Sequence, residues 1–254
     1  MDPEEHDLLA EALRKTMTST APGAALDAAL ARLGWPDMLA EMPTVVIPLV
    51  FRLLGETGTH APVINDVVGA ASLPYAGGSW VAWRRDDCAG TALQLPLQRV
   101  LEPAVVPPAA LAAGRRAAGW WLLGSGRAML TLARQHALDR VQFGRPIAAF
   151  QAVRHKLADT LVALDGAEAV LRAAEEDDLS SLLAKAAAGQ AALLAARHCQ
   201  QVLGGIGFTA EHALHHHVKR ALVLDGLLGS ARELTVEAGR RVIAAGTAPR
   251  LVDL

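Results

Sequence analysis

The chain has 254 residues, which is enough to bury a substantial core in one domain or in one domain with appendages. Apolar residues make up 52% and charged residues 20%, so the composition is that of a globular chain and not of a disordered one. The net charge of −2 gives no general attraction to nucleic acid or to an anionic membrane, and we expect neither as a partner.

The sequence gives no sign of secretion or of membrane insertion. Cys88 and Cys199 lack metal-binding or redox spacing, so we expect two buried thiols in a reducing cytosol. The N-terminus begins with acidic residues and has no apolar signal core. No run of 18 apolar residues without a charge occurs. We therefore predict no membrane span and a cytoplasmic location.

The N-terminal quarter reads as short helices. Apolar residues recur at helical spacing over residues 4–33, with Pro22-Gly23 separating two helices and Gly34-Trp35-Pro36 ending the second. A third helix is predicted from Pro43 or Pro48 to Leu54, followed by a loop.

Residues 64–106 contain only short strand-like fragments, separated by proline and glycine. The fragments are residues 79–83, 92–97 and 100–106. A segment of about forty residues can form a small sheet of a few strands.

Long helical patterns fill the rest of the chain. They cover residues 109–138, 146–174, 179–203 and 210–245. Four such helices with short connections predict an up-and-down bundle. The first contains Gly114, Gly119, Gly124 and Gly126, whose cost to helix propensity we expect close packing of a neighbouring helix to offset.

A corner between two of these helices carries groups suited to an anion. Residues 139–151 read DRVQFGRPIAAFQ, where Phe143-Gly144 is expected to end one helix and Pro146 to lie in the first turn of the next. Arg140 and Gln151 would offer a cation and an amide to a phosphate-bearing ligand. The alternative is that Arg140 forms an ordinary surface salt bridge and that the glycine pair Gly204-Gly205, further along the chain, is only a helix stop.

A second motif, QQVLGGIGF at residues 200–208, contains two adjacent glycines that let a ligand or another chain approach the backbone. The two motifs together, in this order and between long helices, resemble the C-terminal helical domain of the acyl-CoA dehydrogenases, from about Gly114 to Val242. The resemblance implies a mainly α fold with a C-terminal four-helix up-and-down bundle at 107–254. A reduced N-terminal helical segment (1–63) and a vestigial β middle segment (64–106) would precede it.

The resemblance also implies a cofactor, FAD, and the residues that contact it. In the family, these two motifs meet a flavin dinucleotide held mainly by another subunit. The corresponding cofactor-binding residues here are Arg140, Gln142, Phe143, Phe150, Gln151, Gln201, Gly204 and Gly205.

The resemblance assigns this chain no catalytic base. The family reaction removes an α proton from an acyl thioester while a hydride passes from the β carbon to flavin N5, so a carboxylate is needed. Its two known positions correspond to Leu228 and Gly114, neither of which can accept a proton. Asp225 or Glu233 could replace it only with a shifted backbone, and we expect both to be ordinary solvated or ion-paired acids.

Four histidines, His212, His215, His216 and His217, form a cluster near the last helix. His212 and His216 have the i, i+4 spacing of a helical metal pair, but no recognisable zinc pattern completes it. We expect an exposed or interface histidine face and no metal site.

The resemblance suggests a division of labour between two chains. This chain would be the non-catalytic short subunit of a heteromeric FAD-dependent acyl-CoA dehydrogenase in lipid or steroid catabolism. A larger acyl-CoA dehydrogenase subunit would complete an α₂β₂ heterotetramer, share the FAD and hold most of the acyl-CoA substrate. The alternatives are a small self-sufficient dehydrogenase that uses Asp225 or Glu233 as base, and a flavin-free scaffold or regulatory protein.

Overall fold

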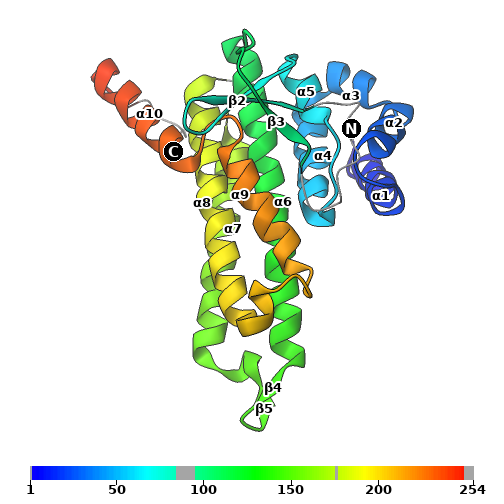
Figure 1. Cartoon of the computed structure of the whole chain (residues 1–254), viewed down its shortest axis with the longest axis vertical. Coiled ribbons are helices and arrows are strands. Elements are labelled where there is room, and N and C mark those ends of the chain that lie inside the picture. Colours follow the sequence, from blue (N-terminus) through cyan, green and yellow to red (C-terminus); the bar gives the residue numbers. More distant parts are fainter. Residues whose placement is uncertain (1, 84–94, 175–176, 249–254) are drawn as a thin grey trace.

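Helices make up most of the protein, and a small sheet covers one end of them (Figure 1). The computed structural model describes residues 2–83, 95–174 and 177–248. The elements are α1 (Pro3–Ser19), α2 (Ala24–Arg32), α3 (Trp35–Glu41), α4 (Pro43–Thr57), α5 (Val63–Val68), β1 (Leu73–Tyr75), β2 (Ser79–Trp83), β3 (Leu97–Val100), α6 (Pro108–Asp139), β4 (Val141–Gln142), β5 (Arg145–Pro146), the 3₁₀ helix η1 (Ile147–Ala149), α7 (Gln151–Ala173), α8 (Asp178–Leu203), the 3₁₀ helix η2 (Gly204–Phe208), α9 (Leu214–Gly226) and α10 (Ala231–Ala245).

Helices α6 to α9 run up and down beside one another and form the long axis of the molecule (Figure 1). Helix α8 lies among α6, α7, α9 and α10, and its many alanines are buried there. The prediction of a mainly α fold with this bundle is confirmed. Among the described residues, the segment Asp178–Phe208 alone is long and apolar enough to cross a membrane, but 67% of its apolar window is buried inside the protein.

The glycines of α6 allow neighbouring helices to approach closely. A Cβ on Gly119 would lie 2.7 Å from Leu171 Cδ2, and one on Gly124 would collide with the Arg52 carbonyl of α4. Contacts this short are sterically excluded for a larger side chain, so the predicted reason for these glycines is confirmed.

The N-terminal part contains two short helices, α3 and α5, that we did not predict. Helix α2 ends at Arg32, as the sequence predicted, but Gly34, in the left-handed conformation, leads directly into α3. Pro36 lies in the first turn of α3, where a missing N–H costs no hydrogen bond. Trp35 is consequently buried, and its indole nitrogen donates to Asp66 Oδ2 at 2.9 Å.

The small sheet has the antiparallel order β1-β2-β3. The strand predicted at 79–83 is confirmed, and β1 was not predicted. The strand predicted at 100–106 is wrong, because pairing with β2 extends over residues 97–100 only. Of the predicted strand at 92–97, residues 92–94 lie outside the described residues, as does Cys88.

The helix predicted at 210–245 is two helices, α9 and α10. Leu228 takes a left-handed backbone conformation (φ 61°) and Gly229 follows at φ 100°, so the helix cannot continue. Ser230 then caps α10 in a reciprocal arrangement with Glu233. Long-range pairing fixes this break, since the Leu228 amide donates to the Pro74 carbonyl at 2.7 Å.

One hydrophobic core joins the parts of the chain. It includes Leu30 and Phe51 of the N-terminal helices, Val81 of the sheet and Trp121 of the bundle. Cys199, also in this core, is a free thiol whose pKa is raised to about 12 by burial. Because this core includes residues from all three predicted segments, it does not mark their boundaries. The segment boundaries that we predicted at residues 63 and 106 remain predictions.

Candidate functional site at the hairpin end of the bundle

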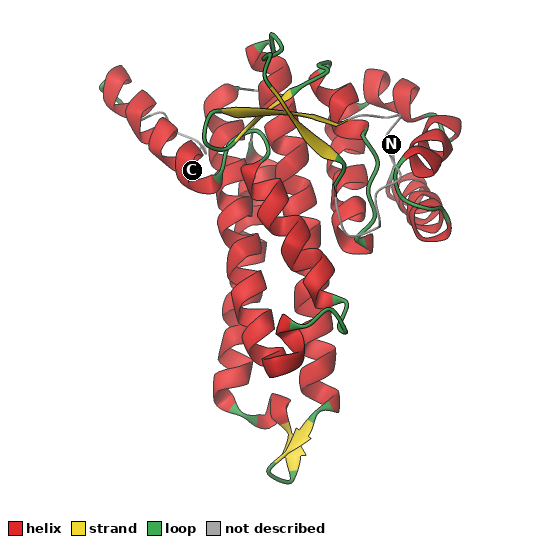
Figure 2. Cartoon of the chain, viewed as in Figure 1, coloured by secondary structure: helices red, strands yellow, loops and turns green. Residues whose placement is uncertain are grey.

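The corner between α6 and α7 is a small β hairpin that projects from one end of the bundle (Figure 2). Phe143 (φ 52°) and Gly144 (φ 77°) form its two-residue turn, both with positive φ. Our prediction that Phe143-Gly144 ends a helix and Pro146 begins the next is wrong. Helix α6 already ends at Asp139, and α7 begins only at Gln151, because strands β4 and β5 pair between them.

The hairpin exposes aromatic and cationic side chains together. Phe143 is 92% exposed and meets the ring of Phe150 edge-on, with centroids 6.1 Å apart. The Arg145 guanidinium lies over the other ring, 4.4 Å from the Phe150 centroid. An exposed cation–π contact of this kind contributes about 0.5–1 kcal/mol. The tip therefore presents aromatic and cationic groups together, where another molecule can contact them.

Arg140, the predicted phosphate-binding residue, lies exposed at the base of the hairpin. Its carbonyl accepts a hydrogen bond from the Ile147 amide at 2.8 Å, which fixes the backbone. No ion pair between described residues involves Arg140, so the alternative of an ordinary surface salt bridge has no support there. Gln142 and Gln151 are also exposed, with amides directed to the Val141 carbonyl and to the His155 ring.

The second motif lies at the C-terminal end of α8 and in η2. Gln201 and Gly205 are exposed, and Gly204 is half-buried with φ 66°. A Cβ at Gly204 or Gly205 would meet no atom within 4 Å. The backbone there is open to a ligand or to another chain, as the sequence predicted.

Both motifs lie at the same end of the bundle (Figure 1). The rings of His136, near the end of α6, and His212, after η2, are edge-on with centroids 6.3 Å apart. The two segments that hold all eight predicted cofactor residues therefore lie at the same end of the bundle. They offer a cation, amide groups, aromatic rings and open backbone, which suit a ligand with phosphate and ring portions.

The opposite end of the bundle holds Gly114 and Leu228, which lie against each other. A Cβ on Gly114 would be 3.0 Å from Leu228 Cδ1 and 2.5 Å from Val68 Cγ2. Leu228 is only 1% exposed. Two positions more than a hundred residues apart therefore meet in space, and apolar atoms of the chain itself fill the space between them.

Comparison with known proteins identifies the family. The sequence family described as "Acyl-CoA dehydrogenase, C-terminal domain" matches residues 106–243, more than half of the chain. The chain belongs to the acyl-CoA dehydrogenase family. Members of this family are flavoproteins that bind FAD.

Two relatives of this acyl-CoA dehydrogenase chain come from Mycobacterium tuberculosis. Acyl-CoA dehydrogenase IpdE2 is 40% identical over 114 residues, which are 44% of this chain and 36% of that protein. Acyl-CoA dehydrogenase FadE34 is 39% identical over 178 residues, 65% of this chain and 23% of that protein. The chain thus spans about a third or less of the length of these relatives.

One solved structure matches almost end to end. A chain of the Tcur3481–Tcur3483 steroid ACAD has a TM-score of 0.76 and 18% sequence identity, with 96% of this chain and 98% of that chain covered. At this identity the likeness shows a common fold.

The loop that carries Leu228 is held by two buried basic side chains that the sequence analysis missed. Lys185 of α8 is fully buried, and its Nζ donates to the carbonyls of Asp225 at 2.9 Å and Gly229 at 2.5 Å. Burial lowers the pKa of Lys185 to about 7, although the charge of Asp225 opposes the shift. Arg115 of α6 reaches the Leu228 carbonyl with Nε at 3.4 Å and pairs with Asp178.

Asp225 and Glu233, the two acids that could have replaced the base, both accept backbone hydrogen bonds in the folded protein. Asp225 Oδ1 accepts from the Ala231 amide at 3.0 Å. Glu233 accepts from the amides of Gly77 and Ser230, and these hydrogen bonds hold the pKa of its carboxyl below the usual range. We expected ordinary solvated or ion-paired acids, and the partners seen here are backbone amides.

Two of the four histidines are buried, whereas we expected an exposed or interface histidine face. His215 and His217 are 9% and 8% exposed, and His212 and His216 are half-buried. Burial lowers the pKa of His217 to about 4, so it is neutral. Among the described residues, no group of three or more histidine, cysteine or acidic side chains could hold a metal ion.

Proposed function

We propose that this chain is the non-catalytic subunit of a two-chain, FAD-dependent acyl-CoA dehydrogenase. Its hairpin end completes the FAD site of a larger partner, which supplies the base and most of the acyl-CoA site. FAD, when bound, accepts a hydride from the β carbon of the thioester while a base removes the α proton. The assembly is an α₂β₂ heterotetramer in the cytoplasm, and its substrate is a lipid or steroid thioester.

The observation that carries this proposal is the contact between Gly114 and Leu228. These are the positions at which the family's base would stand, and neither has a carboxylate. The space beside Gly114 is occupied by Leu228 and Val68. A substrate α carbon would therefore meet apolar side chains and no proton acceptor.

The hairpin end fits the cofactor half of the proposal. Arg140 can pair with a pyrophosphate, since it is exposed and forms no ion pair with any described residue. Phe143 and Phe150 offer ring faces and edges, while Gly204 and Gly205 leave the backbone open. The hairpin β4–β5 projects from one end of the bundle (Figure 1), which suits contact with a dinucleotide bound mainly by another chain.

The comparisons support a partner. The steroid ACAD that shares this fold is named after two proteins, and the matched chain has nearly the same extent as this one. The segments of IpdE2 and FadE34 that match this chain are about a third or less of those proteins.

A self-sufficient enzyme with Asp225 or Glu233 as base is less well supported. Both carboxylates accept backbone hydrogen bonds that hold the loop between α9 and α10 and the start of α10. Releasing either one for catalysis would remove these hydrogen bonds, and the part-buried Ala231 amide would lose its partner if Asp225 moved.

Expression with and without a partner tests the proposal. Produced alone, the chain should be colourless and inactive with acyl-CoA. Co-expressed with a full-length acyl-CoA dehydrogenase chain encoded beside it, it should purify as a yellow, active complex. A flavin-loaded and active homo-oligomer of this chain would refute the proposal, and a complex without flavin absorbance would favour the scaffold alternative.

A further inference from the structure

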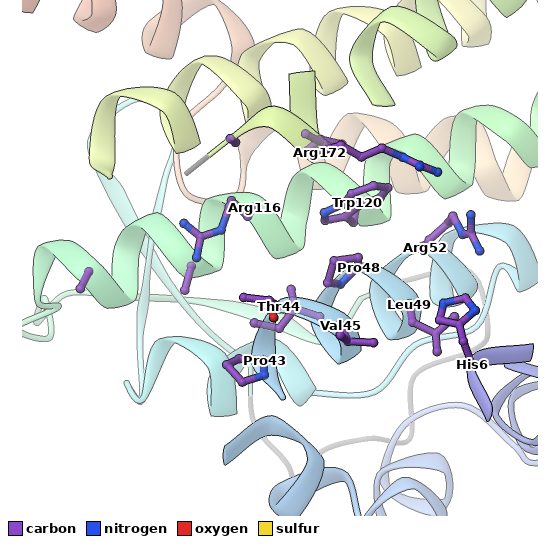
Figure 3. A pocket seen from close by; sticks show the side chains of 15 residues that line it. His6, Pro43, Thr44, Val45, Pro48, Leu49, Arg52, Arg116, Trp120 and Arg172 are labelled. Carbon is purple, nitrogen blue, oxygen red and sulfur yellow. The ribbon is translucent and has the colours of Figure 1, made fainter. Parts of the chain in front are cut away.

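A cavity of about 760 Å³ lies between α4 and α6 (Figure 3). The two helices are closest where Gly55 meets Gly124: a Cβ on Gly55 would lie 2.5 Å from the Ser125 nitrogen. Helices that cross at such a point separate on either side of it. The cavity opens toward the N-terminal ends of both helices, between residues 43–52 and 109–120.

Small side chains on α6 leave this space open, and large apolar ones line it. Ala109, Ala113, Arg116 and Trp120 are spaced by four, three and four residues, so they share one face of α6. Trp120 is only 6% exposed, and its ring lies between Arg172 and Pro48 in Figure 3. A volume of this size is within the range of about 300–1,000 Å³ found for small-molecule sites.

The cavity is lined by basic groups as well. Arg52, Arg116, Arg172 and His6 surround it in Figure 3, and no described lining residue is an aspartate or a glutamate. Partners outside the lining help to position these groups: Arg116 Nη1 donates to Ser181 Oγ at 2.9 Å, Arg172 pairs with Glu168 at 2.6 Å, and Arg52 Nε lies 3.6 Å from Glu56 Oε1. Guanidinium groups in such fixed positions favour a carboxylate or phosphate.

Helix α4 adds a hydrogen-bond acceptor. Pro48 lies inside the helix and has no N–H, so the Thr44 carbonyl lacks its usual partner four residues later. Thr44 and Pro48 both line the cavity. A hydroxyl group on a ligand could donate to this carbonyl.

The cavity is separate from the position of the family's base. Gly114 faces Val68 and Leu228, whereas Ala113 faces the cavity. Consecutive residues point about 100° apart around a helix. The cavity therefore lies on another face of α6.

We propose that this cavity binds an amphipathic organic anion. Its apolar body lies against Trp120 and the alanines, and its carboxylate or phosphate lies among Arg52, Arg116 and Arg172. A free acid and a coenzyme A thioester share this chemistry. The site does not depend on the proposed function, because it uses none of the hairpin residues.

Binding can be measured with cis-parinaric acid, a fluorescent fatty acid that accepts excitation energy from nearby tryptophan. Its fluorescence on tryptophan excitation reports the bound probe. The full-length chain should bind it saturably with one site per chain, and the methyl ester of the probe should bind much more weakly. Competition by palmitate, palmitoyl-CoA and coenzyme A then shows whether a carboxylate or a phosphate group is preferred. Equal binding of the acid and its ester would overturn the proposal.

Paired variants locate the site. Ala113→Leu fills the cavity, and Arg116→Gln removes a charge, so each should weaken binding by about tenfold or more. Arg116→Lys, which keeps the charge, should retain more affinity than Arg116→Gln. The controls Ala158→Leu and Arg240→Gln alter exposed positions on α7 and α10 and should bind like the wild type.

Circular dichroism melts show which variants fold. If Ala113→Leu does not fold, the difference in probe affinity between Arg116→Gln and Arg116→Lys still shows whether the ligand binds at Arg116. Binding by Ala113→Leu equal to that by Ala158→Leu, or by Arg116→Gln equal to that by Arg240→Gln, would place the ligand elsewhere and overturn the assignment.

Discussion

The two ends of the bundle differ in what they present to the outside (Figure 2). At the hairpin end, Arg140 and Phe143 are exposed, and no atom lies within 4 Å of a Cβ placed on Gly205. At the sheet end, Leu228 is 1% exposed and fills the space beside Gly114. The chain thus exposes cationic, aromatic and backbone groups at one end, and at the other end its own apolar side chains fill the space beside Gly114.

The sheet end should not tolerate a carboxylate. Leu228→Glu places an acid among Gly114 and Val68, and we expect a loss of about 3 kcal/mol in the free energy of unfolding. Leu228→Met keeps an apolar side chain of similar volume and should cost less than about 1.5 kcal/mol. Urea unfolding of both variants measures the difference. Equal midpoints would mean that this position is open to water and could hold a base.

Substitutions at the hairpin end should weaken cofactor binding and leave the stability of the fold unchanged. In the yellow complex, Arg140→Ala should weaken FAD retention by about ten- to a hundredfold, the equivalent of about 1.5–3 kcal/mol for one charge-assisted hydrogen bond. Arg240→Ala removes an arginine whose side chain is 75% exposed on α10 and serves as the control. Flavin released on dialysis measures retention. The same release from both variants would remove Arg140 from the cofactor site.

Because Lys185 is buried at the sheet end, the free energy of unfolding should depend on pH. Its pKa is about 7 in the folded protein, against an ordinary value of 10.5, because burial outweighs the attraction of Asp225 and Glu233, and Arg115 lowers it further. The unfolded chain therefore holds one more proton above pH 7, and stability should rise with pH. Relative to Lys185→Met, the wild type should gain about 2 kcal/mol between about pH 7 and 9.

Urea unfolding of the wild type and Lys185→Met at several pH values tests this dependence. A difference between the two proteins that does not change with pH would show that Lys185 has the same pKa in the folded and unfolded states. The loop that carries Leu228 would then be in contact with water, contrary to its burial.

The helices of the bundle could be predicted because each carries a local pattern. The patterns at 109–138 and 179–203 differ by one residue at either end from α6 and by one residue at the start of α8. The break at Leu228 could not be predicted, since its left-handed conformation depends on a hydrogen bond to Pro74, far away in the sequence.

The same distinction applies to the candidate site. The residues of the hairpin end could be predicted from the sequence, because each of the two motifs is a short, continuous segment. The role of Lys185 depends on carbonyls 40 and 44 residues away, which the sequence pattern does not connect to it. The only signal was a lysine within the alanine-rich helix, where a charge at a core position requires partners.

A matched pair of glycine substitutions compares the two ends directly. Gly114→Ala adds a Cβ only 2.5 Å from Val68 Cγ2, and the resulting strain should exceed the gain in helix propensity by about 1 kcal/mol. Gly205→Ala adds the same methyl group in open space and should leave the free energy of unfolding unchanged within about 0.5 kcal/mol. It should instead weaken flavin retention by the complex, since the backbone there would meet the cofactor. If Gly205→Ala destabilised the protein and left flavin retention unchanged, Gly205 would pack against the chain itself. It would then not face a cofactor, and the proposed difference between the two ends would be wrong.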